Sequence, residues 1–166
     1  MRLFALLAAC LMLLTWPAAP WAEPVRLQQE SAAILVQIDS PLRIDTYRTE
    51  YLDEGRTDAI RNTATLRNNT RHEVETFGVQ MRFVDAEGRD MRRPHRPITD
   101  RTIAPFAAAE FQWEHRPGIA EPFADGGKGV IFLEYVRLSD GTVWRHDPDS
   151  VEPQFANILS SLQARD

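Results

Sequence analysis

The sequence predicts a mainly β protein, built as an antiparallel β-sandwich with a short C-terminal helix. Three observations predict this class. Apolar and polar residues alternate with a period of two in several short stretches, turn-forming residues separate these stretches, and apolar residues near the C-terminus follow helical spacing. Short alternating strands divided by turns are typical of two packed antiparallel sheets.

The first 22 residues have the pattern of a signal peptide. Arg2 precedes an apolar run over residues 3–14, and small residues follow that run. The run is shorter than the about 20 apolar residues that a transmembrane helix requires. We therefore expect cleavage after Ala22, a periplasmic or secreted protein, and one folded domain over residues 23–166. An uncleaved N-terminal anchor is the alternative.

A second alternative concerns Cys10. The sequence Leu7-Ala8-Ala9-Cys10 is similar to the lipobox of bacterial lipoproteins, in which the cysteine carries the lipid anchor. The apolar run continues through Leu14, whereas a lipidated cysteine normally ends it. A membrane-anchored lipoprotein stays open as an alternative to a cleaved leader.

Composition excludes several kinds of chemistry. The chain has 166 residues, a formal net charge of -5 and a single cysteine, which lies in the leader. Disulfides, thiol nucleophiles and thiolate metal sites are therefore excluded after residue 22. The acidic balance also argues against nucleic acid as a partner.

The stretch from residue 60 to residue 88 organises the predicted fold. Ile60, Ala64 and Leu66 alternate with polar residues, and after a polar break the alternation resumes over residues 79–83. Such alternation indicates half-buried antiparallel strands. The two strands are predicted to be joined by the turn at residues 68–71, and the segment 85–88 is predicted to form the next turn.

Further strands are expected on both sides of this stretch. They lie at residues 31–39, 42–47, 110–116, 129–138 and 142–146. The segment 129–138 is apolar on both faces over much of its length, which is typical of a central strand. Asp140-Gly141 predicts a hairpin turn that leads into the last strand.

A helix is predicted at about residues 150–164. Asp149 or Ser150 can cap its N-terminus, and four apolar residues follow at positions i, i+3, i+4 and i+7: Phe155, Ile158, Leu159 and Leu162. We expect this apolar face to cover an open end of the sandwich. The alternative is that it docks into a groove of a partner.

The middle of the chain resembles a known class of module. The pattern Ala64-Thr65-Leu66-Arg67-Asn68, followed by residues 79–83, Asp85-Ala86-Glu87-Gly88 and Ile103-Ala104-Pro105, resembles secreted bacterial immunoglobulin-like β-sandwich modules of the FxLYD-related type. The resemblance covers about residues 60–115. It implies an immunoglobulin-like fold and an accessory role, and it carries no catalytic residues.

An arginine- and proline-rich segment at residues 89–101 is the first candidate interaction site. Prolines hold this segment extended at a sheet edge or in a loop, and arginine forks bind carboxylates well. The hypothesis is that Arg92, Arg93 and Arg96 contact an acidic partner. The alternative is a solvated loop whose arginines pair with nearby carboxylates.

Aromatic residues supply a second candidate. Trp113, His115, Tyr135 and Trp144 are the first place to look for a ligand pocket, although packing in the core explains them equally. The four histidines lack the spacing of metal ligands, so no metal site is proposed. No pattern supports a catalytic residue or a cofactor.

These observations predict a non-enzymatic interaction module of the cell envelope that binds another protein. A sandwich edge accepts an added strand, which makes such binding physically natural. The alternatives are a small-ligand or carbohydrate-binding domain, or an enzyme whose polar groups converge from distant loops.

Overall fold

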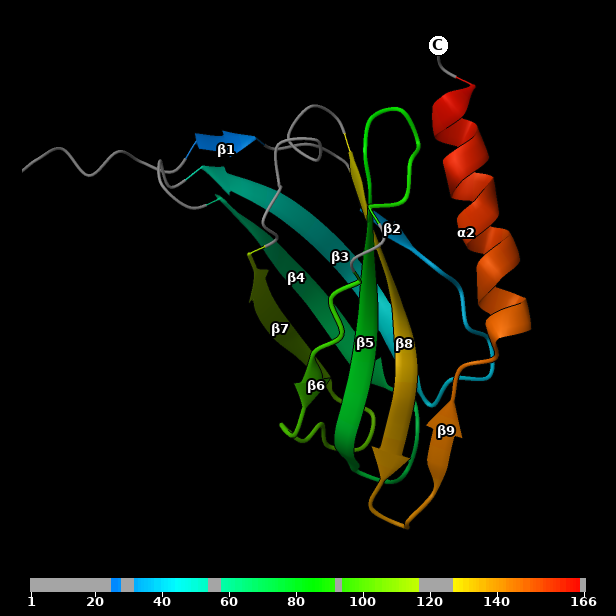
Figure 1. Ribbon diagram of the computed structural model, residues 1–166. Coiled ribbons are helices and arrows are strands. Elements are labelled where there is room, and N and C mark those ends of the chain that lie inside the picture. Colours follow the sequence, from blue (N-terminus) through cyan, green and yellow to red (C-terminus); the bar gives the residue numbers. More distant parts are fainter. Residues whose placement is uncertain (1–24, 28–31, 54–57, 92–93, 117–126, 165–166) are drawn as a thin grey trace, which may run out of the picture.

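The fold consists of two β-sheets and one helix arranged in three layers (Figure 1). The computed structural model describes residues 25–27, 32–53, 58–91, 94–116 and 127–164. The leader and Cys10 lie outside the described residues. The predicted mainly β architecture of two packed sheets is confirmed.

Sheet A is antiparallel and contains four strands in the order β1-β3-β4-β7. These strands are β1 (Val25–Leu27), β3 (Leu42–Asp53), β4 (Asp58–Asn68) and β7 (Ala108–His115). A bulge between Ile44 and Thr46 interrupts the register of β3 with β4. Strand β7 forms one edge of the sheet.

Sheet B contains five strands in the order β2-β8-β5-β6, and β9 also pairs with β8. They are β2 (Ala32–Ile34), β8 (Lys128–Leu138), β5 (Val74–Val84), β6 (Ile98–Thr99) and β9 (Val143–Arg145). Strand β2 runs parallel to β8, and the other pairings are antiparallel. Both β2 and β9 lie on the edge of β8 that β5 leaves free.

The organising stretch is not a hairpin. Both predicted strands exist, but β4 belongs to sheet A and β5 to sheet B, so the turn between them carries the chain from one layer to the other. Alternation identifies a half-buried strand but does not say which strand lies beside it.

The main core fills the space between the two sheets. Inward residues of sheet A include Leu42, Ile60 and Leu66, and they pack against inward residues of sheet B such as Phe77 and Ile131. All are buried because alternate positions of each strand face the opposite sheet. The apolar strand β8 is central in its sheet, since it pairs with β5 on one side and with β2 and β9 on the other.

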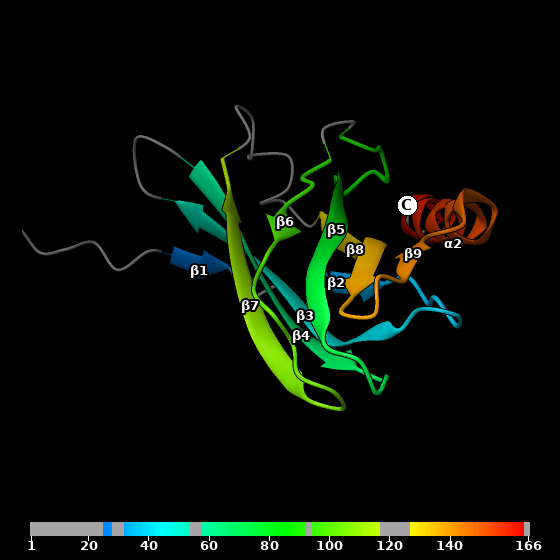
Figure 2. The same ribbon diagram turned by 90° about the horizontal axis from the view of Figure 1, so that it is seen from below.

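The C-terminal helix α2 (Pro148–Gln163) forms the third layer. Asp147 caps its N-terminus by accepting a hydrogen bond from the Asp149 amide over 3.0 Å, and Pro148 opens the first turn. Figure 2 shows the helix on the far side of sheet B from sheet A. Val151 and Phe155 pack there on outward residues of sheet B. The helix thus covers the outer face of a sheet rather than an open end of the sandwich.

The connection from β2 to β3 closes a gap in the edge of β8. The predicted strand over residues 31–39 shortens to β2 because side chains replace backbone pairing after it. The Gln37 side chain bonds the backbone of Leu133, and the Gln154 side chain of α2 bonds both backbone groups of Val36. These bonds fix the helix to the sheet edge.

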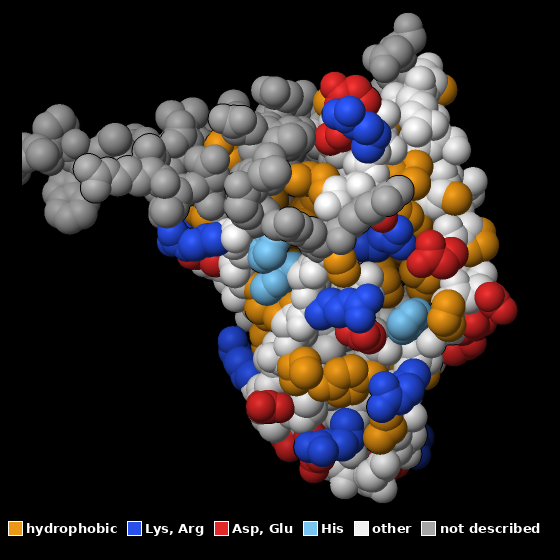
Figure 3. All heavy atoms as spheres, viewed as in Figure 1, with side chains coloured by type: hydrophobic (Ala, Val, Ile, Leu, Met, Phe, Trp, Pro, Cys, Tyr) orange, Lys and Arg blue, Asp and Glu red, His pale blue; other side chains and the backbone are white. Residues whose placement is uncertain are grey.

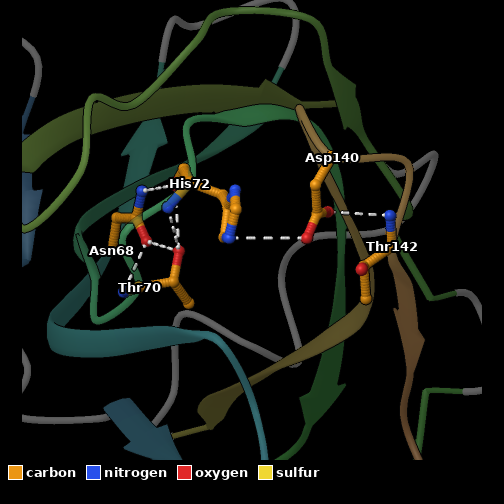
Figure 4. Close-up of polar contacts among 5 residues, drawn as sticks. All are labelled: Asn68, Thr70, His72, Asp140 and Thr142. Carbon is orange, nitrogen blue, oxygen red and sulfur yellow. Dashed lines mark hydrogen bonds and ion pairs between the residues drawn. The ribbon is translucent and has the colours of Figure 1, made fainter.

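Two turns meet at one end of the sandwich (Figure 4). In the turn between β4 and β5, the fully buried Asn68 donates to the carbonyl oxygen of His72 and accepts from the amide and hydroxyl of Thr70. The His72 ring lies 3.5 Å from a carboxylate oxygen of Asp140, in the turn between β8 and β9. Hydrogen bonds from Thr142 lower the pKa of Asp140.

Candidate interaction surface

The four residues of the predicted pocket lie in different layers. Trp113 and His115 extend from β7 toward the space between the sheets, where Trp113 stacks on Phe111. Tyr135 lies on the outer face of sheet B, over Gly78, where an added Cβ would come within 2.6 Å of its ring. Trp144 is on β9 and packs against the main core. The structure brings Trp113 and His115 together and leaves Tyr135 apart from them.

His115 belongs instead to a stack of three rings. Its ring lies 5.8 Å from that of Phe83 and 4.8 Å from that of His95, measured between centroids. Burial lowers the pKa of both histidines, and the charge of His115 lowers the pKa of His95 further. The stack therefore favours neutral imidazoles between β7 and the edge of sheet B.

The inner face of sheet A also carries buried polar side chains. The Tyr47 hydroxyl donates to the side-chain oxygen of Asn62 over 2.7 Å, and burial raises the pKa of the phenol well above its usual range. The phenol therefore stays protonated and acts as a hydrogen-bond donor. An added Cβ on Gly129 would lie 2.7 Å from this hydroxyl, so the close approach of the two sheets here requires glycine.

A hollow of about 360 Å³ lies beside the β2–β3 connection, and its lining includes the apolar side chains of Ile34, Leu42 and Leu133. In the part of the chain that the structure describes, no three histidine, cysteine or acidic side chains gather closely enough to hold a metal ion. No helix there is long and apolar enough to cross a membrane.

The arginine-rich segment runs along the edge of sheet B. Arg92 and Arg93 lie outside the described residues, and an Arg96 nitrogen lies 3.8 Å from a carboxylate oxygen of Glu134. Nearby, Arg89 bonds Asp85 over 2.6 Å. On the face seen in Figure 3, basic and acidic side chains are interspersed. Arg89 and Arg96 therefore pair with nearby carboxylates, which was the alternative interpretation of this segment.

The arginine-rich segment also covers the edge of sheet B, where it pairs with β5. Its backbone pairs with β5 through β6 and through single bridges from His95 to Met81 and from Asp90 to Val84. Pro94 and Pro97 interrupt it. Proline and broken pairing are common devices that prevent a sheet edge from accepting another strand.

In strand β7, at the edge of sheet A, neither a proline nor a register shift interrupts the strand. Its eight residues contain no proline, glycine or lysine, and its register with β4 runs from residue 108 to residue 115 without a shift. Among the described strands it pairs only with β4. Long, unbroken edge strands are templates for the addition of another strand.

The hydrogen bonds around β7 identify the residues whose backbone faces outward. The Ala107 carbonyl accepts from Asn68 at the end of β4, whereas the Glu110 carbonyl accepts from the side chain of Arg101. Backbone groups of successive residues in a strand point to alternate sides. The backbone groups of Ala108, Glu110, Gln112 and Glu114 therefore face away from β4, and we call this row the free edge of β7.

Arg101 lies against this free edge. Its guanidinium donates to the Glu110 carbonyl over 3.3 Å and lies 5.1 Å from the centroid of the Phe111 ring. Sequence reasoning counted Arg101 within the arginine-rich segment but did not single it out. The contact depends on the crossover from sheet B to sheet A, which local patterns do not reveal.

The outward side chains of β7 are polar and acidic. Glu110, Gln112 and Glu114 are all exposed on the outer face of sheet A. Glu114 pairs with Arg61 on β4 over 2.9 Å, whereas Thr65 of β4 lies opposite Glu110. The edge thus presents two carboxylates on its outer face, while its inner face carries the buried ring of Phe111 and the half-buried ring of Trp113.

Comparisons with known proteins support the fold and give no function. No family model matches the chain, and no curated protein matches it. A 1.85 Å X-ray structure of a hypothetical protein from Peptoclostridium difficile 630 is similar in fold, with 12% identity and a TM-score of 0.50 over 76% of this chain and 93% of that chain. An X-ray structure of a Northeast Structural Genomics Consortium target has 14% identity and a TM-score of 0.45 over 65% of this chain and 81% of that chain.

Proposed function

We propose that this protein is a non-enzymatic interaction module of the cell envelope, which binds an extended segment of another protein along the free edge of β7. The observation that carries the proposal is an eight-residue edge strand without proline, glycine or bulge. Its outward backbone groups supply donors and acceptors for a new strand. The contrast with the proline-guarded edge of sheet B supports this choice of edge.

The cellular setting and the fold family are parts of the same proposal. The signal-like pattern of residues 1–22 supports a periplasmic or secreted protein, or a lipoprotein anchored through Cys10. Two facing sheets with consecutive strands in different layers support the immunoglobulin-like assignment and the resemblance to FxLYD-related modules. Contact of Arg92, Arg93 and Arg96 with an acidic surface stays a separate prediction.

The test is capture from envelope extract by the mature protein and by an edge-blocked variant. Gln112→Pro removes a backbone donor that faces the free edge and leaves the bonds to β4 in place. Gln112→Ala is the matched control, because it truncates the same side chain and keeps the donor.

The expected result is a defined partner that the native protein and Gln112→Ala retain and that Gln112→Pro loses, with similar melting temperatures for all three. Capture by Gln112→Pro at the native level would overturn binding through this edge. Turnover of a substrate by the purified protein would overturn the non-enzymatic role.

A further inference from the structure

We infer that the segment bound at β7 alternates cationic and apolar residues and displaces Arg101 from the Glu110 carbonyl. It pairs antiparallel with β7, as the described strands of sheet A all do with their neighbours. This inference rests on the proposed function and specifies the chemistry of the partner. It follows from three features of the free edge: its outward side chains, its inward side chains and its backbone acceptor.

The outward side chains select cations. In an added strand, residues opposite Glu110 and Glu114 point to the same face of the sheet as those carboxylates. Glu114 already pairs with Arg61 on its other side, so a cation on the added strand would extend the row Arg61, Glu114. The β4 residue opposite Glu110 is the neutral Thr65, so a cation on the added strand can pair with the Glu110 carboxylate. Acidic residues at these positions would meet like charge.

The inward side chains select apolar residues. Residues of the added strand opposite Phe111 and Trp113 would point toward the space between the sheets. Trp113 is only half-buried because the sheet ends at β7. The Arg101 side chain now lies over the Phe111 ring. An apolar side chain there would bury more of Trp113 and replace the guanidinium that now lies over the buried Phe111 ring.

The backbone acceptor explains the role of Arg101. The guanidinium holds the Glu110 carbonyl at 3.3 Å, the long end of hydrogen-bond distances, and the side chain is exposed. The amide of an added strand would donate to the same oxygen with normal strand geometry. Arg101 therefore occupies the Glu110 carbonyl in the free protein, and the amide of a partner strand can take its place.

The probe is a fluorescent synthetic peptide of about eight residues, the length of an ordinary strand, with alternating lysine and valine. In antiparallel pairing the lysine residues direct both their side chains toward the glutamates and their amides toward β7. We expect saturable binding by fluorescence anisotropy. N-methylation of the lysine amides should abolish binding, while N-methylation of the valine amides should preserve it. The two methylated peptides have the same composition and charge.

Protein variants test the two side-chain contacts separately. Glu110→Lys should weaken binding of the lysine–valine peptide by about threefold to tenfold, since a favourable cross-strand pair becomes a like-charge pair. Glu110→Gln is the conservative control and should have a smaller effect. Arg101→Ala should tighten binding, because the added strand no longer competes with the guanidinium for the Glu110 carbonyl.

The outcomes separate this inference from the function on which it rests. Equal binding of the two methylated peptides, or tighter binding to Glu110→Lys, would overturn the cationic antiparallel strand. If an envelope partner is lost with Gln112→Pro but the lysine–valine peptide does not displace it, the partner chemistry is wrong and edge binding stands. Weaker peptide binding by Arg101→Ala would overturn the competition between Arg101 and the added strand for the Glu110 carbonyl.

Discussion

The side chain of Gln37 and the backbone of Leu133 form two hydrogen bonds that take the place of a strand pair. The Leu133 amide donates to the Gln37 side-chain oxygen over 2.7 Å, and the Gln37 side-chain nitrogen donates to the Leu133 carbonyl over 2.8 Å. This pair fills the interval between β2 and β9 along β8. A buried central strand thereby has its backbone groups satisfied by a glutamine.

Gln37→Ala should lower the free energy of unfolding by about 1–3 kcal/mol, because it leaves backbone groups of Leu133 without their partner. Urea unfolding followed by tryptophan fluorescence measures the change. Asp39→Ala is the control, since Asp39 is exposed in the same connection and its replacement should change stability by less than about 0.5 kcal/mol. Equal stability of the Gln37→Ala variant and the native protein would show that the Gln37 side chain does not replace strand pairing at Leu133.

Asn68→Asp should destabilise the protein by about 3 kcal/mol or more. The Asn68 side-chain nitrogen donates to the carbonyl oxygens of His72, Ile103 and Ala104 over 2.8, 3.1 and 3.2 Å. A carboxylate would place a buried negative charge against these three oxygens and donate nothing.

Thermal denaturation at neutral pH measures the effect of this substitution. Asn69→Asp is the matched control because Asn69 is the exposed neighbour in the same turn. A similar melting temperature for both variants would show that the Asn68 side chain does not hold the turn to the β6–β7 crossover.

The stacked histidines predict a loss of stability in mildly acidic solution. Their pKa values are lowered in the folded protein from the ordinary value of 6.5, so the unfolded chain binds protons more readily. The stabilisation is therefore complete above about pH 6.5 and is lost as the pH falls through the lowered values of the folded state.

Replacing His95 by Phe retains a ring over His115 and removes one titrating group. The variant should lose less stability than the native protein between about pH 7.5 and pH 5.5, measured by urea unfolding at each pH. Parallel pH profiles for the two proteins would contradict the contribution of His95.

Local patterns in the sequence were sufficient to locate most strands. Strand β8 was predicted to within one residue, and the predicted stretch 79–83 lies within β5, whose start at Val74 was missed. The distribution of side chains between core and solvent is a local property of a strand, which is why local patterns detect it. The same patterns implied that β4 and β5 form a hairpin, which was wrong. Pairing between strands depends on contacts distant in sequence, and alternation carries no information about them.

The candidate interaction surface was harder to predict from the sequence than the strands. The strand that contains Glu110 and Trp113 was predicted, but its position at the edge of the sheet follows from the strand order of sheet A. Arg101 meets Glu110 only because the chain crosses between the sheets from β6 to β7. Tyr135 was grouped with Trp113 because both are aromatic residues in strands. Tyr135 lies on the outer face of sheet B, next to a bulge at Gly78 in the pairing of β5 with β8.

Phe155→Ala should separate the two roles considered for the C-terminal helix. Phe155 is 2% exposed, packs with Val151 and Leu162 against sheet B, and lies under the Arg82 guanidinium, 3.4 Å from its ring centroid. Its truncation should lower the free energy of unfolding by about 3–5 kcal/mol, because a large buried ring leaves a cavity. Urea unfolding followed by circular dichroism measures this change.

Asn157→Ala, on the exposed side of α2, is the control and should change stability by less than about 0.5 kcal/mol. Removal of the chain from Val151 onward should abolish cooperative unfolding, since it exposes Val130 and Phe132 on the outer face of sheet B. Cooperative folding of this truncated protein, with a small effect of Phe155→Ala, would instead favour a helix that docks on a partner. The burial of Phe155 against β5 and β8 argues for the first outcome, because a helix reserved for a partner would leave its apolar face exposed in the free protein.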